Sequence, residues 1–131
     1  MVSLPNRALI GIFLLLMVFG CQEDKNNAVI DAAKAYQTTI DENIALISGK
    51  KKEIRQQIND NLQAKQDTFV LAKQLPILNN AIFLLNSKHD YITKSITQFQ
   101  AGQIKEDSLK NVITNGQTYT DSLMINNDLT L

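Results

Sequence analysis

The sequence is poor in the residues from which catalytic and metal sites are built. Its 131 residues include one histidine, one cysteine and no tryptophan. A histidine-based catalytic triad, a multi-histidine metal site or a zinc site of histidine and cysteine needs partners that these two residues cannot supply. A disulfide within the chain is excluded for the same reason. We therefore expect no enzyme, no metal site and no cofactor, and the sequence identifies no small-molecule substrate.

Clustered glycine and an excess of one charge are also missing. Gly49, Gly102 and Gly116 are solitary, so no glycine-rich phosphate loop is present. The 13 basic residues balance the 13 acidic ones, which gives no basic surface for nucleic acid. Carboxylate pairs such as Glu106-Asp107 are adjacent in the chain, and adjacent residues on a helix point about 100° apart. They therefore do not converge as an acid and base pair would.

The N-terminus carries a long uncharged run. Residues 1–20 contain one charged residue, Arg7, which is followed by apolar and small residues from Ala8 to Gly20. This run is shorter than the roughly 20 residues of a membrane span, but it suits the apolar region of a secretory signal peptide. We therefore predict a signal peptide at residues 1–20. Its removal leaves 12 basic and 13 acidic residues.

The residues at the end of this run resemble the lipobox of bacterial lipoproteins. Val18-Phe19-Gly20-Cys21 has an aliphatic residue first and a small residue before the cysteine, although Phe19 stands where the family usually has a smaller side chain. The resemblance implies cleavage before Cys21, a diacylglycerol thioether on its sulfur and an acylated amino group. Several acyl chains on one residue anchor a protein firmly.

The same resemblance implies a place in the envelope of a Gram-negative bacterium. In the sorting rule of enteric lipoproteins, a residue other than Asp after the cysteine favours the outer membrane, and this chain has Gln22. Glu23-Asp24 resembles the acidic start that some groups use for the cell surface. Both the periplasmic side and the cell surface stay open.

The mature chain is predicted to be helical after a polar tether at residues 21–27. Apolar residues recur every three or four positions from Val29 to Ala72, and they keep one phase across Gly49. A shared phase favours one continuous helix, since a single glycine in a helix interior costs only about 1 kcal/mol. Proline suits the first position of a helix, so a corner is predicted at Leu75-Pro76.

The next helix carries a regular apolar seam. Spacings of four and three residues connect Leu78, Ile82, Leu85, His89, Ile92, Ile96 and Phe99. Such a seam is typical of helices packed nearly parallel to one another. The helix is predicted to end near Ala101 with Gly102 as its cap, and a third helix to begin near Lys105 before an acidic first turn.

The predicted fold is all-α, with a long N-terminal helix and an antiparallel helical hairpin packed on its C-terminal half. The alternative is a four-helix up-down bundle in which Gly49 forms a turn. The helical domain is expected to cover residues 28–125, and residues 126–131 are expected to be frayed.

Three residues of the second helix are candidates for binding a protein partner. Phe83 points about 140° from Leu78, on the polar side of the helix, while Ile77 and Leu84 flank the seam. An aromatic anchor inside a polar rim is what binding surfaces tend to use. The alternative is that another helix of the same chain covers Phe83.

Two polar features of the sequence indicate a function less specifically. The cluster of Lys50, Lys51, Lys52 and Arg55 could contact anionic lipid, or it could be a solvated helix face. His89 lies on the apolar seam, where we expect a structural histidine at a helix interface.

The functional hypothesis is a lipid-anchored binding or scaffolding protein, an accessory subunit of an envelope or secretion assembly. A protein partner or self-association is expected, because the features that the sequence reveals are apolar helix-packing surfaces and a lipid anchor. The alternative is a small periplasmic or surface sensor or inhibitor, such as an immunity or exclusion lipoprotein.

Overall fold

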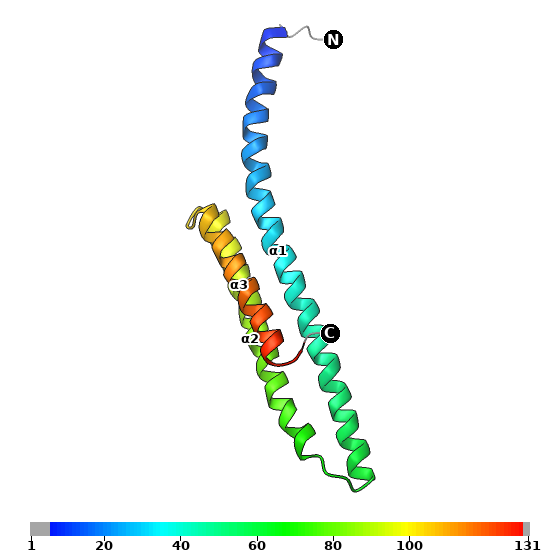
Figure 1. Ribbon diagram of the computed structural model, residues 1–131. Coiled ribbons are helices and arrows are strands. Elements are labelled where there is room, and N and C mark those ends of the chain that lie inside the picture. Colours follow the sequence, from blue (N-terminus) through cyan, green and yellow to red (C-terminus); the bar gives the residue numbers. More distant parts are fainter. Residues whose placement is uncertain (1–5, 130–131) are drawn as a thin grey trace.

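The computed structural model consists of three helices (Figure 1). It describes the backbone of residues 6–129 and the side chains of residues 26–129. Helix α1 spans Asn6–Gln63, α2 spans Phe69–Gln100 and α3 spans Glu106–Asn126. The all-α, three-helix fold is confirmed. The side chains of the predicted signal peptide, of Cys21 and of most of the tether lie outside the described residues, so these assignments stay predictions.

Helix α1 continues through Gly49, as the phase of its apolar residues predicts. Gly49 is exposed, and a Cβ atom built on it meets nothing within 4 Å. The glycine therefore interrupts neither the hydrogen bonds of the helix nor its packing. The four-helix alternative, which needed a turn here, is wrong.

The predicted corner at Leu75-Pro76 is also wrong, because the turn lies at residues 64–68. Lys65 adopts a left-handed conformation with φ of 56°, and the Gln66 amide donates to the Asn61 carbonyl at 2.7 Å, which closes the end of α1. The Asp67 carboxylate then accepts a hydrogen bond from the Phe69 amide at 2.9 Å, a contact that favours the start of a helix.

Pro76 lies inside α2, where a proline removes one backbone hydrogen bond. Its side chain is exposed, so water can reach the carbonyl that loses its donor. Packing of the apolar residues on both sides of Pro76 outweighs its cost to the helix. The other end of α2 agrees with the prediction, since Gly102 follows it with φ of 75° and α3 begins at Glu106.

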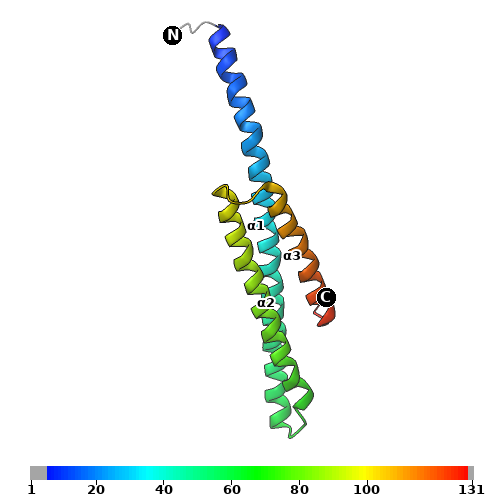
Figure 2. The same ribbon diagram turned by 90° about the vertical axis from the view of Figure 1, so that its left-hand side faces the viewer.

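The core runs along the line where the three helices meet. Helix α2 is antiparallel to α1, and α3 returns beside both (Figures 1 and 2). The side chains that are essentially inaccessible to water come from all three helices and include Ile40, Ile47, Leu85, Ile92 and Leu109. The seam of α2 is therefore buried in the middle of the helix.

Gly116 allows α3 to approach α1 closely. A Cβ atom at this position would lie 2.8 Å from Cε1 and 2.9 Å from the hydroxyl oxygen of Tyr36. The Tyr36 hydroxyl also forms a 2.6 Å hydrogen bond with the Thr120 hydroxyl. Burial raises the pKa of Tyr36 above its usual 10.0, although the bond to Thr120 acts in the opposite direction.

Helix α3 stops well before the turn between α1 and α2 (Figure 2). Asp128 has φ of 55°, and the Leu129 amide donates to the Met124 carbonyl at 2.7 Å, the pattern of a Schellman stop. Leu129 is 3% exposed and the Lys50 ammonium donates to the Asp128 carbonyl. Residues 127–129 thus close the three-helix part, where a frayed tail was expected.

Beyond this closure the molecule has two helices instead of three. We call residues 51–77, which comprise the last turns of α1, the turn at 64–68 and the first turns of α2, the two-helix end. Ile54 is the one large apolar residue of this segment that is fully buried, whereas Ile58, Leu71 and Leu75 are half-buried.

Candidate binding surface

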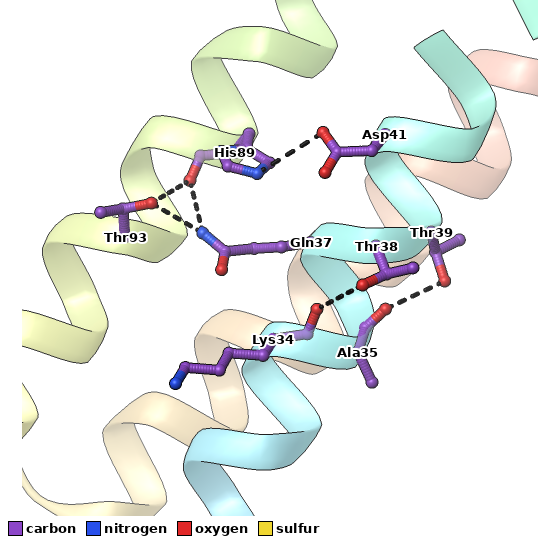
Figure 3. A network of polar contacts seen from close by, with 8 residues as sticks. All are labelled: Lys34, Ala35, Gln37, Thr38, Thr39, Asp41, His89 and Thr93. Atoms are coloured by element: carbon purple, nitrogen blue, oxygen red, sulfur yellow. Dashed lines mark hydrogen bonds and ion pairs between the residues drawn. The ribbon is translucent and has the colours of Figure 1, made fainter. Parts of the chain in front are cut away.

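A small polar cluster joins α1 to α2 (Figure 3). The Gln37 side-chain amide donates to the His89 carbonyl at 3.1 Å and to the Thr93 hydroxyl at 2.7 Å. The His89 imidazole lies 3.5 Å from the Asp41 carboxylate. The histidine therefore sits at a helix interface, half-buried, as the seam predicts. These groups bond to one another and leave no nucleophile or acid aimed at a cavity.

The described residues contain no group of three or more His, Cys, Asp or Glu side chains that could hold a metal ion. An open groove runs between α1 and α3 beside Ala28, Ala32 and Ile113. Its charged groups are already paired, because the Lys110 ammonium lies 2.9 Å from the Glu106 carboxylate. That pairing raises the pKa of Lys110.

The most unusual surface of the described chain is the side of α2 that faces away from α1. Five large apolar side chains are exposed there, by 49% to 68%, and we call them the outer face of α2: Phe69, Val70, Ile77, Phe83 and Tyr91. At 100° per residue they fall within an arc of about 140° that does not overlap the buried seam. Helix α2 is therefore apolar on two sides, of which one is covered.

Part of the outer face is uncovered because α3 is short. Lys88 faces α3, since its ammonium lies 4.6 Å from the centre of the Tyr119 ring. Val70 precedes Lys88 by 18 residues, which is five helical turns, so the two side chains point in the same direction. Val70 is nevertheless 68% exposed, because α3 ends before it reaches this level.

The three predicted partner-binding residues lie together on this side of α2. Phe83 is 66% and Ile77 49% exposed, while Leu84 is half-buried between them. No helix among the described residues covers Phe83. That Phe83 contacts a partner stays a prediction.

Sequence reasoning missed Phe69, Val70 and Tyr91 as members of this surface. Phe69 was assigned to the apolar stripe of the first helix, because the turn was placed too late. Asp67-Thr68 directly before the apolar run FVLA was the available signal, since such residues commonly begin helices.

Lysines accompany the aromatic residues of the outer face. The Lys73 ammonium lies 4.2 Å from the centre of the Phe69 ring, and that of Lys88 lies 5.8 Å from the Tyr91 ring. Lys94 is exposed on the same side, and Asp90 is the acidic residue at its margin. The surface thus combines apolar side chains with an excess of positive charge.

The predicted basic cluster lies on α1 in and beside the two-helix end. Lys52 and Arg55 are exposed, Lys51 is half-buried, and Lys50 is engaged with Asp128. Residues 50–77 carry six basic and three acidic side chains, so this end of the molecule is positively charged.

Two further findings bear on what the surface could bind. By its length and composition alone, helix α2 could cross a membrane, and 17% of its most apolar 18-residue segment is buried. This is weak evidence, since core helices of water-soluble proteins meet the same criteria. Comparison with protein-family models, with curated proteins and with solved structures finds no match.

Proposed function

We propose that this chain is a lipid-anchored helical protein of the Gram-negative cell envelope, most consistent with the outer membrane, that serves as a non-enzymatic binding or scaffolding subunit. The observation that carries the binding role is the outer face of α2. Exposed apolar side chains that gather on one surface commonly mark an interaction site, and this one is rimmed by lysines and asparagines.

The proposed anchor and the binding face are connected through one helix. Helix α1 runs without a break from Asn6 to Gln63 and forms one wall of the bundle, so the backbone of Cys21 belongs to the same helix that packs against α2. The lipobox at Val18 to Cys21 supports this anchor. A scaffold needs an attachment point and a binding surface, whereas an enzyme needs a cleft with reactive groups.

Acylation is tested by replacing Cys21, the single cysteine of the chain. Cys21→Ser should abolish labelling of the expressed protein by an alkyne fatty acid and release it from carbonate-washed membranes. Gln22→Ser changes the next residue and should leave both properties intact. Unchanged labelling of the Cys21→Ser protein would contradict the lipid anchor.

The binding role is tested by crosslinking in intact membranes. A photoreactive amino acid at position 83 should give a reproducible set of crosslinked species, whereas the same probe at Ile125, which is 64% exposed on α3, should give few. Equal crosslinking at both positions would contradict a dedicated binding face on α2.

A further inference from the structure

We infer that the outer face of α2 binds side-on to an anionic lipid surface. The inference rests on the proposed function for the identity of the membrane, which would be the one that holds the anchor. It does not need the anchor for its chemistry, because the apolar side chains and the lysines belong to α2 itself. It assigns a specific occupant, an anionic lipid surface, to the binding face of the proposed function.

Charge complementarity favours lipid headgroups as the occupant. Lys73 and Lys94 lie on this side of α2 and Lys88 lies at its margin toward α3, with Asp90 as their acidic neighbour. The two-helix end, which includes Lys73, has five basic and three acidic residues. Helices that lie in the interface of an anionic membrane combine such lysines with aromatic and aliphatic side chains. Lysine stems can lie along the apolar surface while their ammonium groups reach phosphates.

The spacing of the apolar residues argues against a partner helix. Val70, Ile77, Leu84 and Tyr91 follow one another every seven residues, but the intervening positions of that seam include Lys73, Gln74, Asn80 and Lys88. A helix packed in coiled-coil fashion needs apolar residues at both core positions of each heptad. A lipid interface requires no such regularity, since apolar groups and headgroup ligands can alternate along it.

A second copy of the chain is disfavoured by charge. Two outer faces placed against each other would bring together six lysines and two aspartates. Like charges in contact oppose association. An anionic surface turns the same lysines into favourable contacts, at about fivefold in affinity for each lysine close to the surface.

The polar turn sets the orientation on the membrane. Gln63, Lys65, Gln66 and Asp67 occupy the tip of the two-helix end and are exposed. Insertion of the tip would strip water from these groups at considerable cost. A side-on position leaves the turn in water and places the outer face, about 33 Å long from Phe69 to Tyr91 at 1.5 Å per residue, against the headgroups.

The proposed anchor is within reach of the same membrane. Because Gln37 bonds to residues 89 and 93, the end of α2 at Gln100 is level with about residue 29 of α1. Cys21 is eight residues further, or about 12 Å along the helix. An acylated Cys21 and the outer face would act as two membrane signals on one body, and the outer face would add to the attachment that the acyl chains supply.

The test uses residues 21–131 with Cys21→Ser, which lacks both the apolar leader and the lipid. The buried residues of the described chain all lie between Val29 and Leu129, so this fragment retains the complete core. Flotation with vesicles of phosphatidylcholine containing 30% phosphatidylglycerol is compared with flotation with pure phosphatidylcholine. We expect about tenfold tighter binding to the anionic vesicles, with an affinity that falls as salt is added.

Matched variants locate the binding surface. Phe83→Ser should weaken vesicle binding about tenfold, whereas Ile125→Ser removes an equally exposed apolar side chain from α3 and should not. Lys73→Gln should weaken binding about fivefold, and Lys34→Gln on α1 should leave it unchanged. Circular dichroism should show the same helix content for all four variants.

Several outcomes would overturn the inference. Absence of flotation, equal binding to both vesicle types, or equal losses for Phe83→Ser and Ile125→Ser would each do so. If vesicles do not bind while position 83 crosslinks to a protein in intact membranes, the face is a protein interface, and the proposed function survives without this inference. If vesicles bind but Cys21 carries no acyl group, the anchor fails and the lipid-binding face stands.

Discussion

The two ends of α2 share a sequence pattern but differ in burial. Near α3, Leu85 and Ile92 are inaccessible to water, and Ser95 is buried as well. In the two-helix end Leu71 and Leu75, which continue the line of the seam toward the start of α2, are half-buried, and Val70 and Ile77 are exposed. Apolar periodicity therefore specifies which side of a helix can be buried, whereas burial itself depends on how far the neighbouring helix extends.

The difference follows from the ordered end of α3. A helix that merely frayed would leave its last apolar side chains in water, but Leu129 folds back into the core and Lys50 binds the Asp128 carbonyl. The stop is thus stabilised by its own contacts. The uncovered two-helix end is a defined feature of this fold.

The largest loss of stability is expected for a substitution in the part of α2 that packs beside α3. Leu85→Ala removes a side chain with 0% exposure and should lower the free energy of unfolding by about 2–5 kcal/mol. Thermal and urea melts measure the loss. Leu75→Ala, which truncates a half-buried leucine of the same seam, should cost clearly less, and equal losses would contradict the difference between the two parts.

The second effect concerns the contact between α1 and α3. Gly116→Ala places a methyl group within 3 Å of the Tyr36 ring, and the required shift should cost about 1–3 kcal/mol of stability. Gly49→Ala is the matched control, because its methyl group points into open space. That variant should gain about 1 kcal/mol, the difference in helix propensity. A stabilised Gly116→Ala protein would show that α3 packs less closely than described.

A third prediction concerns pH and the same contact. Burial raises the pKa of Tyr36 above 10.0, so the unfolded chain loses the tyrosine proton at a lower pH than the folded one. The stabilisation is present below pH 10 and should be lost as the pH rises through the folded-state pKa. Melts at increasing pH should therefore show an alkaline decline that is smaller in Tyr36→Phe.

Thr120→Val complements this measurement at neutral pH. It removes the hydroxyl that bonds to Tyr36 at 2.6 Å and should cost about 1 kcal/mol. Thr118→Val, an exposed threonine whose hydroxyl bonds to the carbonyl of Thr114 in its own helix, should have a smaller effect. If the two variants melted alike, the Tyr36–Thr120 bond would not contribute to stability.

Some of these structural features follow from the sequence, and others depend on tertiary contacts. The continuity of α1 was predictable, because apolar residues on both sides of Gly49 share one phase. The position of the turn was misjudged, because Pro76 was treated as the start of a helix and Lys65 in a left-handed conformation carries no glycine signal. The exposure of Phe83 was predictable from its angle to the seam. That Val70 and Ile77 are uncovered depends on the tertiary position of the α3 stop, which no local pattern specifies.

The smallest change in stability is expected on the outer face of α2. Phe83→Ala removes a phenyl ring that is 66% exposed, so the melt should change by no more than about 0.5 kcal/mol. Its neighbour Leu85, two residues away on the buried side, provides the reference for a loss of several kcal/mol in the same helix. A large loss for Phe83→Ala would mean that another surface covers this residue in solution, and repeating the melt over a range of protein concentrations would then identify self-association by a concentration-dependent midpoint.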